Sequence, residues 1–219
     1  MDRGFKRGYV DRALFVRNDE DYLLVAQVYI DDIVFGATID AQAIEFSEEM
    51  KKEFEMSMVG ELTFFLGHQV KQRKEGIFIS QEKYARNIVK KFGLDSKKHA
   101  STPMSSSTKL NVDSSGVEVS PTLYRSIIRS LLYLTASRPD IAFSVGVCAR
   151  YQAAPKESHL TAVKRIIRYV NGTPDYGLWY SKDSNACLAG YSNADWVGSV
   201  DDRKSTSGGC FYETILFLG

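Results

Sequence analysis

The cysteines and histidines of this 219-residue chain are few and too scattered to form a metal-binding motif. No CxxC pair occurs, and an odd count of three cysteines is typical of free thiols in a reducing compartment. The chain also lacks a long apolar run, since Arg129 and Ser130 interrupt residues 127–134, well short of the ~20 residues of a membrane span. The N-terminus shows no apolar core of a secretory signal. The sequence predicts an intracellular protein, cytoplasmic or nuclear, with no membrane partner and no Cys/His metal centre.

An excess of charge of either sign is lacking too. Lysine and arginine number 28 against 27 aspartate and glutamate, for a net charge of +1. A nucleic-acid partner is therefore neither favoured nor excluded by net charge, and must be argued from local patches. What the chain does contain is apolar material, at 44% of residues, with 12 each of Tyr and Phe. That amount excludes a disordered tail and suffices for one sizeable domain or two small ones.

The order of the expected elements predicts an α+β fold, because strands come first, helices follow and strands return. Period-two and β-branched runs predict strands at 22–29, 33–35, 62–70, 76–80, 178–180, 187–191 and 209–212. Three- and four-residue apolar spacing predicts helices at 40–54, 80–92, 124–132, 141–148 and 159–170. Asp40 and Ser80 are the expected N-caps of the first two helices, and Gly93 is expected to end the second. Residues 99–120, rich in Ser, Thr and Asn, are the expected linker.

The first expected hairpin carries an acidic pair. Tyr29-Ile30-Asp31-Asp32 joins its two strands and places two carboxylates at the tip. Carboxylate oxygens suit divalent cations, and two such ions can activate a primer hydroxyl and stabilise a leaving pyrophosphate, as in polymerases. By itself an Asp-Asp pair between strands is more often a solvated turn. The surrounding sequence decides between these interpretations.

Several segments in a fixed order resemble one family. They are GELTFFLG (60–67), GIFISQEKYA (76–85), TPM (102–104), SLLYLTASRPDI (130–141), PKESHLTAVKRIIRYVNGT (155–173) and YSNADW with DDRKSTSGG (191–209). Together with the Tyr-x-Asp-Asp box at Tyr29–Asp32, they are similar to the reverse transcriptase region of copia-type LTR retrotransposon Pol polyproteins, in particular those of plants. The resemblance covers roughly residues 5–212.

The resemblance implies a domain order and a set of site residues. Residues 1–79 would be the C-terminal part of the palm, with Asp31 and Asp32 as catalytic and metal-binding residues. The hairpin 64–79 would be the primer grip, centred on Phe65, Leu66 and Gly67. Residues 80–175 would form the thumb and connection, with the linker at 99–120. Residues 176–219 would open the RNase H domain.

The resemblance also implies partners and a cofactor. These are Mg²⁺ or Mn²⁺, an RNA template, RNA–DNA or DNA duplex, dNTP in the intact enzyme, and the rest of the Pol polyprotein. The expected nucleic-acid-binding residues are Lys83, Arg86, Lys90, Lys91 and Arg129. The residues themselves agree in part, because 83–98 is a local basic stretch of the kind that neutralises phosphates, and 164–168 is a second. An ordinary solvated helix face is the alternative interpretation of both stretches.

Four departures from the family pattern bear on activity. The palm's third metal-binding aspartate lies far upstream of the Tyr-x-Asp-Asp box in this family, and only 28 residues precede Tyr29 here. Asn193 stands where the family has the first RNase H acid, and Asp195 matches the second; an amide supplies no anionic charge to Mg²⁺. Arg129 stands where relatives usually carry Gly, on a helix expected to follow the minor groove of the duplex, where a bulky cation would be poorly tolerated. Residues 213–219 stop matching the family.

Three hypotheses follow from the sequence. The chain is a reverse transcriptase fragment that is inactive alone, which the departures favour. The second hypothesis is an enzyme that works when another chain supplies the missing aspartate. The third is a non-catalytic module that binds RNA or RNA–DNA duplex.

Overall fold

The computed structural model describes residues 4–19, 21–58, 60–105, 109–182, 189–195 and 201–212, with the backbone alone described at 189–195, 206 and 208–212. The chain forms two compact units, the first extending to Thr63 and the second beginning at Phe64. Helices occur with antiparallel sheets, which confirms the α+β class. The division into palm, thumb and RNase H parts at 79 and 175 stays a prediction.

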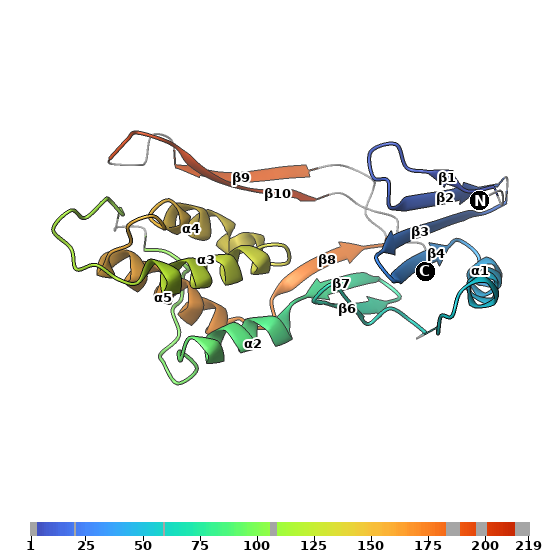
Figure 1. The fold of residues 1–219 in the computed structure, drawn as a ribbon, viewed down its shortest axis with the longest axis horizontal. Helices are drawn as coiled ribbons and strands as arrows, with labels where there is room; N and C mark the ends of the chain where they lie inside the picture. The colour runs from blue at the N-terminus through green and yellow to red at the C-terminus, as the bar shows by residue number, and fades with distance from the viewer. Residues whose placement is uncertain are drawn as a thin grey trace. The chain divides into compact units, whose positions relative to one another are not determined.

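The first unit is a four-stranded antiparallel sheet with one helix (Figure 1). Its elements are β1 (Lys6–Arg7), β2 (Leu14–Asn18), β3 (Leu23–Tyr29), β4 (Asp32–Ala37) and α1 (Asp40–Glu53), and the strand order is β1-β2-β3-β4. Leu24 and Ala26 of β3 pack with Ala37 and with Phe46 of α1 in a small core. Because side chains alternate along a strand, the other residues of β3, ending at Tyr29, lie on the face turned away from α1.

Two features of this unit differ from the sequence expectation. Asp40 does not cap α1, because Ile39 is the N-cap, has no side-chain cap bond and leaves Asp40 as the first helical residue. There the carboxylate still meets the positive end of the helix dipole. No strand is expected at Leu14–Asn18, yet β2 pairs along its whole length with β3. The apolar run of β2 is too short to show the two-residue period of a strand. Its extended conformation therefore follows from pairing with β3 and not from its own sequence pattern.

The second unit contains a four-stranded antiparallel sheet. The strands are β5 (Phe64–Phe65), β6 (His68–Arg73), β7 (Gly76–Ser80) and β8 (Gly177–Ser181), in the order β5-β6-β7-β8. The chain leaves the sheet after Ser80 and returns at Gly177, and these two residues are register partners. All the helices of this unit are therefore inserted between two neighbouring strands.

Two expectations for this sheet are wrong in detail. The expected strand at 62–70 is broken into β5 and β6, because Leu66 and Gly67 form a tight turn. Ser80 is the last residue of β7 rather than a helix cap, and Gln81 takes the N-cap position without a side-chain cap bond. The helix itself does end as expected, since Gly93 adopts a φ of 66°, in the left-handed region that glycine occupies freely.

Four helices share the larger core of the second unit. They are α2 (Glu82–Lys91), α3 (Pro121–Leu134), α4 (Pro139–Ala149) and α5 (Glu157–Gly172). The three later helices confirm the positions expected from apolar spacing. Tyr124, Leu131, Val145 and Ile166 are among their fully buried side chains. Ser120 caps α3 by accepting a hydrogen bond from Leu123 N at 3.3 Å, and Pro121 occupies the first turn, where no donor is lost.

The Ser/Thr-rich segment expected as a linker is bound to these helices in its described parts, 99–105 and 109–120. Arg165 donates to the carbonyl oxygen of Thr102 at 3.1 Å, and Tyr151 donates to that of Leu110 at 3.0 Å. His159 is fully buried, stacks on Tyr151, accepts the Lys156 N–H at 2.9 Å through Nδ1 and donates from Nε2 to Asn111 O at 2.7 Å. These hydrogen bonds hold the segment against α5 and against Tyr151, which follows α4.

The last two strands, β9 (Ala189–Asp195) and β10 (Thr206–Tyr212), form a separate two-stranded antiparallel sheet. Its register pairs Asn193 with Gly208 and Asp195 with Thr206. Residues 187 and 188 of the expected strand, and the unmatched tail 213–219, lie outside the described residues. No helix within the described ranges combines the length and apolar character needed to cross a membrane.

Candidate functional site

The acidic pair lies at the tip of the β3–β4 hairpin, as the sequence predicts. Tyr29 pairs with Asp32, so the connecting turn consists of Ile30 and Asp31 alone. Ile30 has a φ of 56°, a backbone conformation that costs a β-branched residue conformational energy. A positive φ at the first central position is the feature of a type II′ hairpin turn. A glycine is usual there, so this turn is strained at the place where its carboxylates are presented.

The tip is open to solvent. Ile30 is 85% exposed and Tyr29 47%, and both Asp31 and Asp32 are exposed. Since Leu24 and Ala26 define the face that packs on α1, the register puts Tyr29 and Asp32 on the opposite face. The two carboxylates can therefore reach a ligand without displacing the core.

Another acid approaches the same face of this sheet. Asp11 accepts the N–H of Ala13 at 2.8 Å and the side-chain amide of Gln27 at 3.2 Å, and Gln27 shares its face with Tyr29. Within the described ranges, however, no three His, Cys, Asp or Glu side chains gather closely enough to hold a metal ion. The oxygen donors of Asp31 and Asp32 suit Mg²⁺ or Mn²⁺ and would supply part of a coordination shell.

The primer-grip residues implied by the resemblance form a second strained turn, in the second unit. Phe65 pairs with His68, and the two residues between them, Leu66 and Gly67, have φ values of 47° and 79°. Two positive φ values are the mark of a type I′ turn. Tyr133 of α3 donates its hydroxyl hydrogen to the carbonyl oxygen of Leu66 at 2.7 Å. The turn is thus fixed by a helix far away in sequence.

Gly67 is required at this position for two reasons. Its φ lies in the left-handed region, and a Cβ added there would overlap the Tyr133 hydroxyl oxygen. The ring of Tyr133 in turn packs edge-on against Tyr84 of α2, with centroids 4.9 Å apart. Sequence reasoning missed Tyr133, and its place one helical turn after Arg129 is the signal that could have found it.

The predicted basic residues of α2 and α3 lie on exposed surfaces. Lys83, Arg86 and Lys90 fall on one stripe of α2 by their spacing. Arg86 is also paired with Glu82 at 2.8 Å, and the Lys91 ammonium lies 5.2 Å from the Phe92 ring. Arg129 is exposed on the face of α3 that carries Tyr133, so the structure brings it close to the Leu66 turn.

Two residues of the second basic stretch have partners within the chain. Arg165 is bonded to Thr102 through its backbone oxygen and its hydroxyl, and Lys164 lies 4.0 Å from Glu157. The contacts of Arg165 and Lys164 are those of an ordinary solvated helix face.

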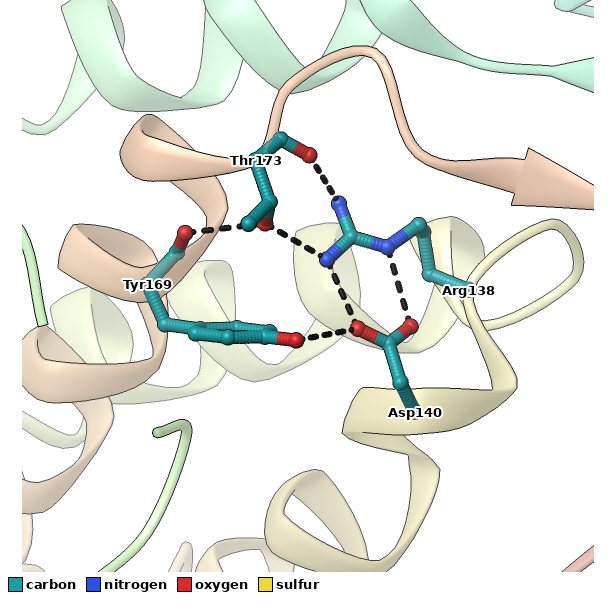
Figure 2. A network of polar contacts seen from close by, with 4 residues as sticks. All are labelled: Arg138, Asp140, Tyr169 and Thr173. Atoms are coloured by element: carbon teal, nitrogen blue, oxygen red, sulfur yellow. Dashed lines mark hydrogen bonds and ion pairs between the residues drawn. The ribbon is translucent and has the colours of Figure 1, made fainter. Parts of the chain in front are cut away.

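Arg138 and Asp140 of the family motif at 130–141 form a polar network with Tyr169 and Thr173, in which Arg138 is almost fully buried (Figure 2). Arg138 donates to both carboxylate oxygens of Asp140 and to the carbonyl and hydroxyl oxygens of Thr173. Tyr169 donates to Asp140 at 2.9 Å; partial burial, together with this bond, raises the pKa of its hydroxyl. The network joins the start of α4 to the end of α5 and explains these motif residues without a ligand.

The predicted RNase H remnant can be placed by its backbone only. Asn193 and Asp195 both lie in β9, and their side chains fall outside the described residues.

Comparison with known proteins identifies the family. A family model described as reverse transcriptase (RNA-dependent DNA polymerase) matches residues 1–106. The chain is 33% identical, over 99% of its length, to a retrovirus-related Pol polyprotein from transposon RE2 of Arabidopsis thaliana, and 34% identical to that from transposon RE1. It spans 14% of the length of each of these two proteins. An uncharacterized mitochondrial protein of the same plant is 34% identical over 87% of this chain and 78% of its own length.

The chain belongs to the reverse transcriptase family. Its relatives place it, more narrowly, among the Pol polyproteins of copia-type plant retrotransposons, as the sequence motifs indicate. No solved structure matches it.

Proposed function

We propose that this chain carries the metal-binding hairpin and the duplex-holding helices of an RNA-directed DNA polymerase, and that alone it binds duplex without extending a primer. The observation that carries the proposal is the hairpin tip, where strain at Ile30 presents Asp31 and Asp32 to solvent. Backbone strain of this kind persists where the fold requires a defined presentation of side chains. A turn that only connected two strands would gain stability from Gly, Asn or Asp at that position.

In this proposal Asp31 and Asp32 are metal ligands. A bound pair of divalent cations would polarise the primer hydroxyl and neutralise charge on the leaving pyrophosphate. The chain's own residues hold the two carboxylates in place, because the β3–β4 register fixes Asp32 opposite Tyr29. Two adjacent carboxylates supply too few ligands for two ions, and this is why the chain alone is proposed to be inactive.

The duplex contacts come from the second unit. The Leu66–Gly67 turn would meet the primer strand, and Arg129 and the α2 stripe of Lys83 and Lys90 would meet phosphates. In the domain order that the resemblance implies, the Leu66–Gly67 turn would belong to the palm, which ends at 79. The cations of α2 and α3 would belong to the thumb, which begins at 80. No RNase H activity is proposed, because Asn193 lacks the charge of the acid it replaces.

Primer extension on an RNA template, with Mg²⁺ or Mn²⁺, tests the catalytic half of the proposal. The chain alone is expected to give no product. A fragment that supplies the upstream palm acid should restore incorporation, and Asp31→Asn should abolish it. Incorporation by the chain alone that depends on both Asp31 and Asp11 would show that Asp11 completes the site and that the proposed inactivity is wrong.

Duplex binding tests the other half. A blunt RNA–DNA duplex should bind with a negative log–log salt slope, and the Lys90→Ala/Lys91→Ala double variant should make that slope shallower by roughly 1.8, at about 0.9 per phosphate contact. Lys52→Ala is the matched control, since Lys52 is exposed on α1 outside the proposed surface. Binding that is absent, or independent of salt, would contradict the duplex-holding role. Binding without rescued incorporation would leave a non-catalytic duplex-binding module.

A further inference from the structure

One face of the sheet β5–β8 gathers aromatic and basic side chains. The register aligns Lys71, Phe78 and Trp179 in one row across β6, β7 and β8. Phe64 is on the same face, because it pairs with Gln69, two residues before Lys71. The other positions of this face are Arg73, Gly76, Ser80, Gly177 and Ser181. No position on it is acidic.

Two of the aromatic rings lie over glycines. A Cβ on Gly76 would be 2.9 Å from Cζ2 of Trp179, and a Cβ on Gly177 would be 2.9 Å from Cζ of Phe78. Each ring therefore leans across to the neighbouring strand and covers a residue that has no side chain. Trp179 remains 42% exposed and Phe64 54%, so ring surface is available to a ligand.

This face differs from one that is built to pack against protein. Neither buried core of the described chain includes a residue of β5–β8, and helices α2–α5 lie beyond one end of the sheet (Figure 1). The opposite face is largely aliphatic, with Val70, Ile79 and Leu178 in one row. An apolar partner on the aromatic face would bury Lys71 without a counter-charge, at a large desolvation cost. The cations instead favour an anionic ligand.

We propose that the face formed by Phe64, Lys71, Arg73, Phe78 and Trp179 binds single-stranded nucleic acid. Unpaired bases would stack on the three rings, and the backbone phosphates would lie near the two cations. Aromatic platforms flanked by basic residues bind single strands with little sequence preference, because every base has a π face. The inference stands independently of the polymerase proposal.

Fluorescence anisotropy with the full chain tests this site, using short unstructured oligouridine and oligothymidine probes and a blunt RNA–DNA duplex. Trp179→Ala should weaken single-strand binding by about fivefold to a hundredfold, which is the usual effect of removing one stacked base contact. Trp179→Phe should retain most of the affinity. Neither variant should change duplex binding. The Lys71→Ala/Arg73→Ala variant should make the single-strand salt slope shallower by roughly 1.4, and Lys52→Ala should leave it unchanged.

The outcomes separate this site from the duplex surface. Lys90→Ala/Lys91→Ala should impair duplex binding and spare the single strand, so either proposal can fail without the other. The inference is overturned if no single strand binds, or if a folded Trp179→Ala variant binds it as the parent does. If Trp179→Ala does not fold, the exposed Lys71 and Arg73 decide the question, and an unchanged salt slope overturns the inference. A preference for oligouridine or oligothymidine identifies the strand as RNA or DNA.

Discussion

Arg138 allows a quantitative test of the network that joins α4 to α5. Its side chain is 1% exposed and lies 2.8 and 2.9 Å from the two oxygens of Asp140 and 2.7 and 2.8 Å from the two oxygens of Thr173 (Figure 2). The guanidinium also lies 5.6 Å from the ring of Tyr169 and 5.2 Å from that of Tyr176. The partners differ in burial, because the Asp140 side chain is 34% exposed. The two ends of the pair should therefore respond differently to mutation.

Asp140→Asn should be the more harmful change. It leaves a buried guanidinium without a counter-charge, which costs about 3–4 kcal/mol of unfolding free energy. Arg138→Met keeps much of the side-chain volume, and water can reach Asp140 in its place. This variant loses mainly the bonds to Thr173, at about 2–3 kcal/mol. In the double variant no charge is left unpaired, so the loss should fall about 2 kcal/mol short of the sum of the two single losses.

Urea unfolding followed by far-ultraviolet circular dichroism measures these differences, because four of the described helices belong to the second unit. Asp95→Asn is the matched control, since Asp95 is exposed, and it should change stability by less than about 0.5 kcal/mol. Single losses that simply add, to within about 0.5 kcal/mol, would refute the reasoning from unequal burial. A more harmful Arg138→Met than Asp140→Asn would also refute it.

Three further changes test other parts of the fold. Ile30→Gly removes the strain of a φ of 56° and should raise the unfolding free energy of the first unit by about 1 kcal/mol in urea, whereas no gain from glycine would contradict a strained turn. Gly67→Ala should lower that of the second unit by about 1–3 kcal/mol, and Tyr133→Phe by about 1 kcal/mol; a stable Gly67→Ala variant would deny the clash. Burial raises the pKa of Cys148 from 9.0 to about 12, so the unfolded chain binds fewer protons than the native one in that window. Stability should fall between pH 9 and 12 by up to about 1.4 kcal/mol per pH unit from this group, and a Cys148→Ala variant should fall less steeply.

The spacing of apolar residues along the sequence predicts the helices that bury one stripe and the strands that bury one face. Helices α3 to α5 follow from apolar spacing, because residues such as Ile127, Val145 and Val163 are in fact buried. The Tyr29–Asp32 hairpin follows from two apolar runs around an acidic pair. The expected N-cap Asp40 lies one residue after the observed N-cap, Ile39, and the expected N-cap Ser80 lies one residue before the observed one, Gln81. A capping residue type alone does not fix the helix boundary to the residue.

The features of the fold that the sequence does not predict depend on contacts between residues far apart in the chain. The pairing of β8 with β7 depends on where the helices return the chain, which the run Leu178–Tyr180 does not reveal. The break at Leu66 depends on a hydrogen bond from Tyr133, on another element. The same limit applies to the site, because the sequence predicts the Tyr29–Asp32 hairpin but not the Leu66–Gly67 turn, and the positive φ values in both turns are known only from the structure. Among the residues expected to contact nucleic acid, Arg129 lies on the face of α3 that carries Tyr133, whose hydroxyl contacts the Leu66 turn.

The proposed duplex binding and the proposed metal site depend on different cores. The hairpin that carries Asp31 and Asp32 belongs to the first unit, whose buried hydrophobic core consists of Leu24, Ala26, Ala37 and Phe46. The Leu66 turn, the basic stripe of α2 and the Arg138 network belong to the second unit, whose core starts at Ala85. The two cores share no residue, so changes at Asp31 or Asp32 remove no buried contact from the second unit. A variant that lacks the proposed metal ligands should therefore keep the packing and hydrogen bonding of the second unit, and with them the surface proposed to bind duplex.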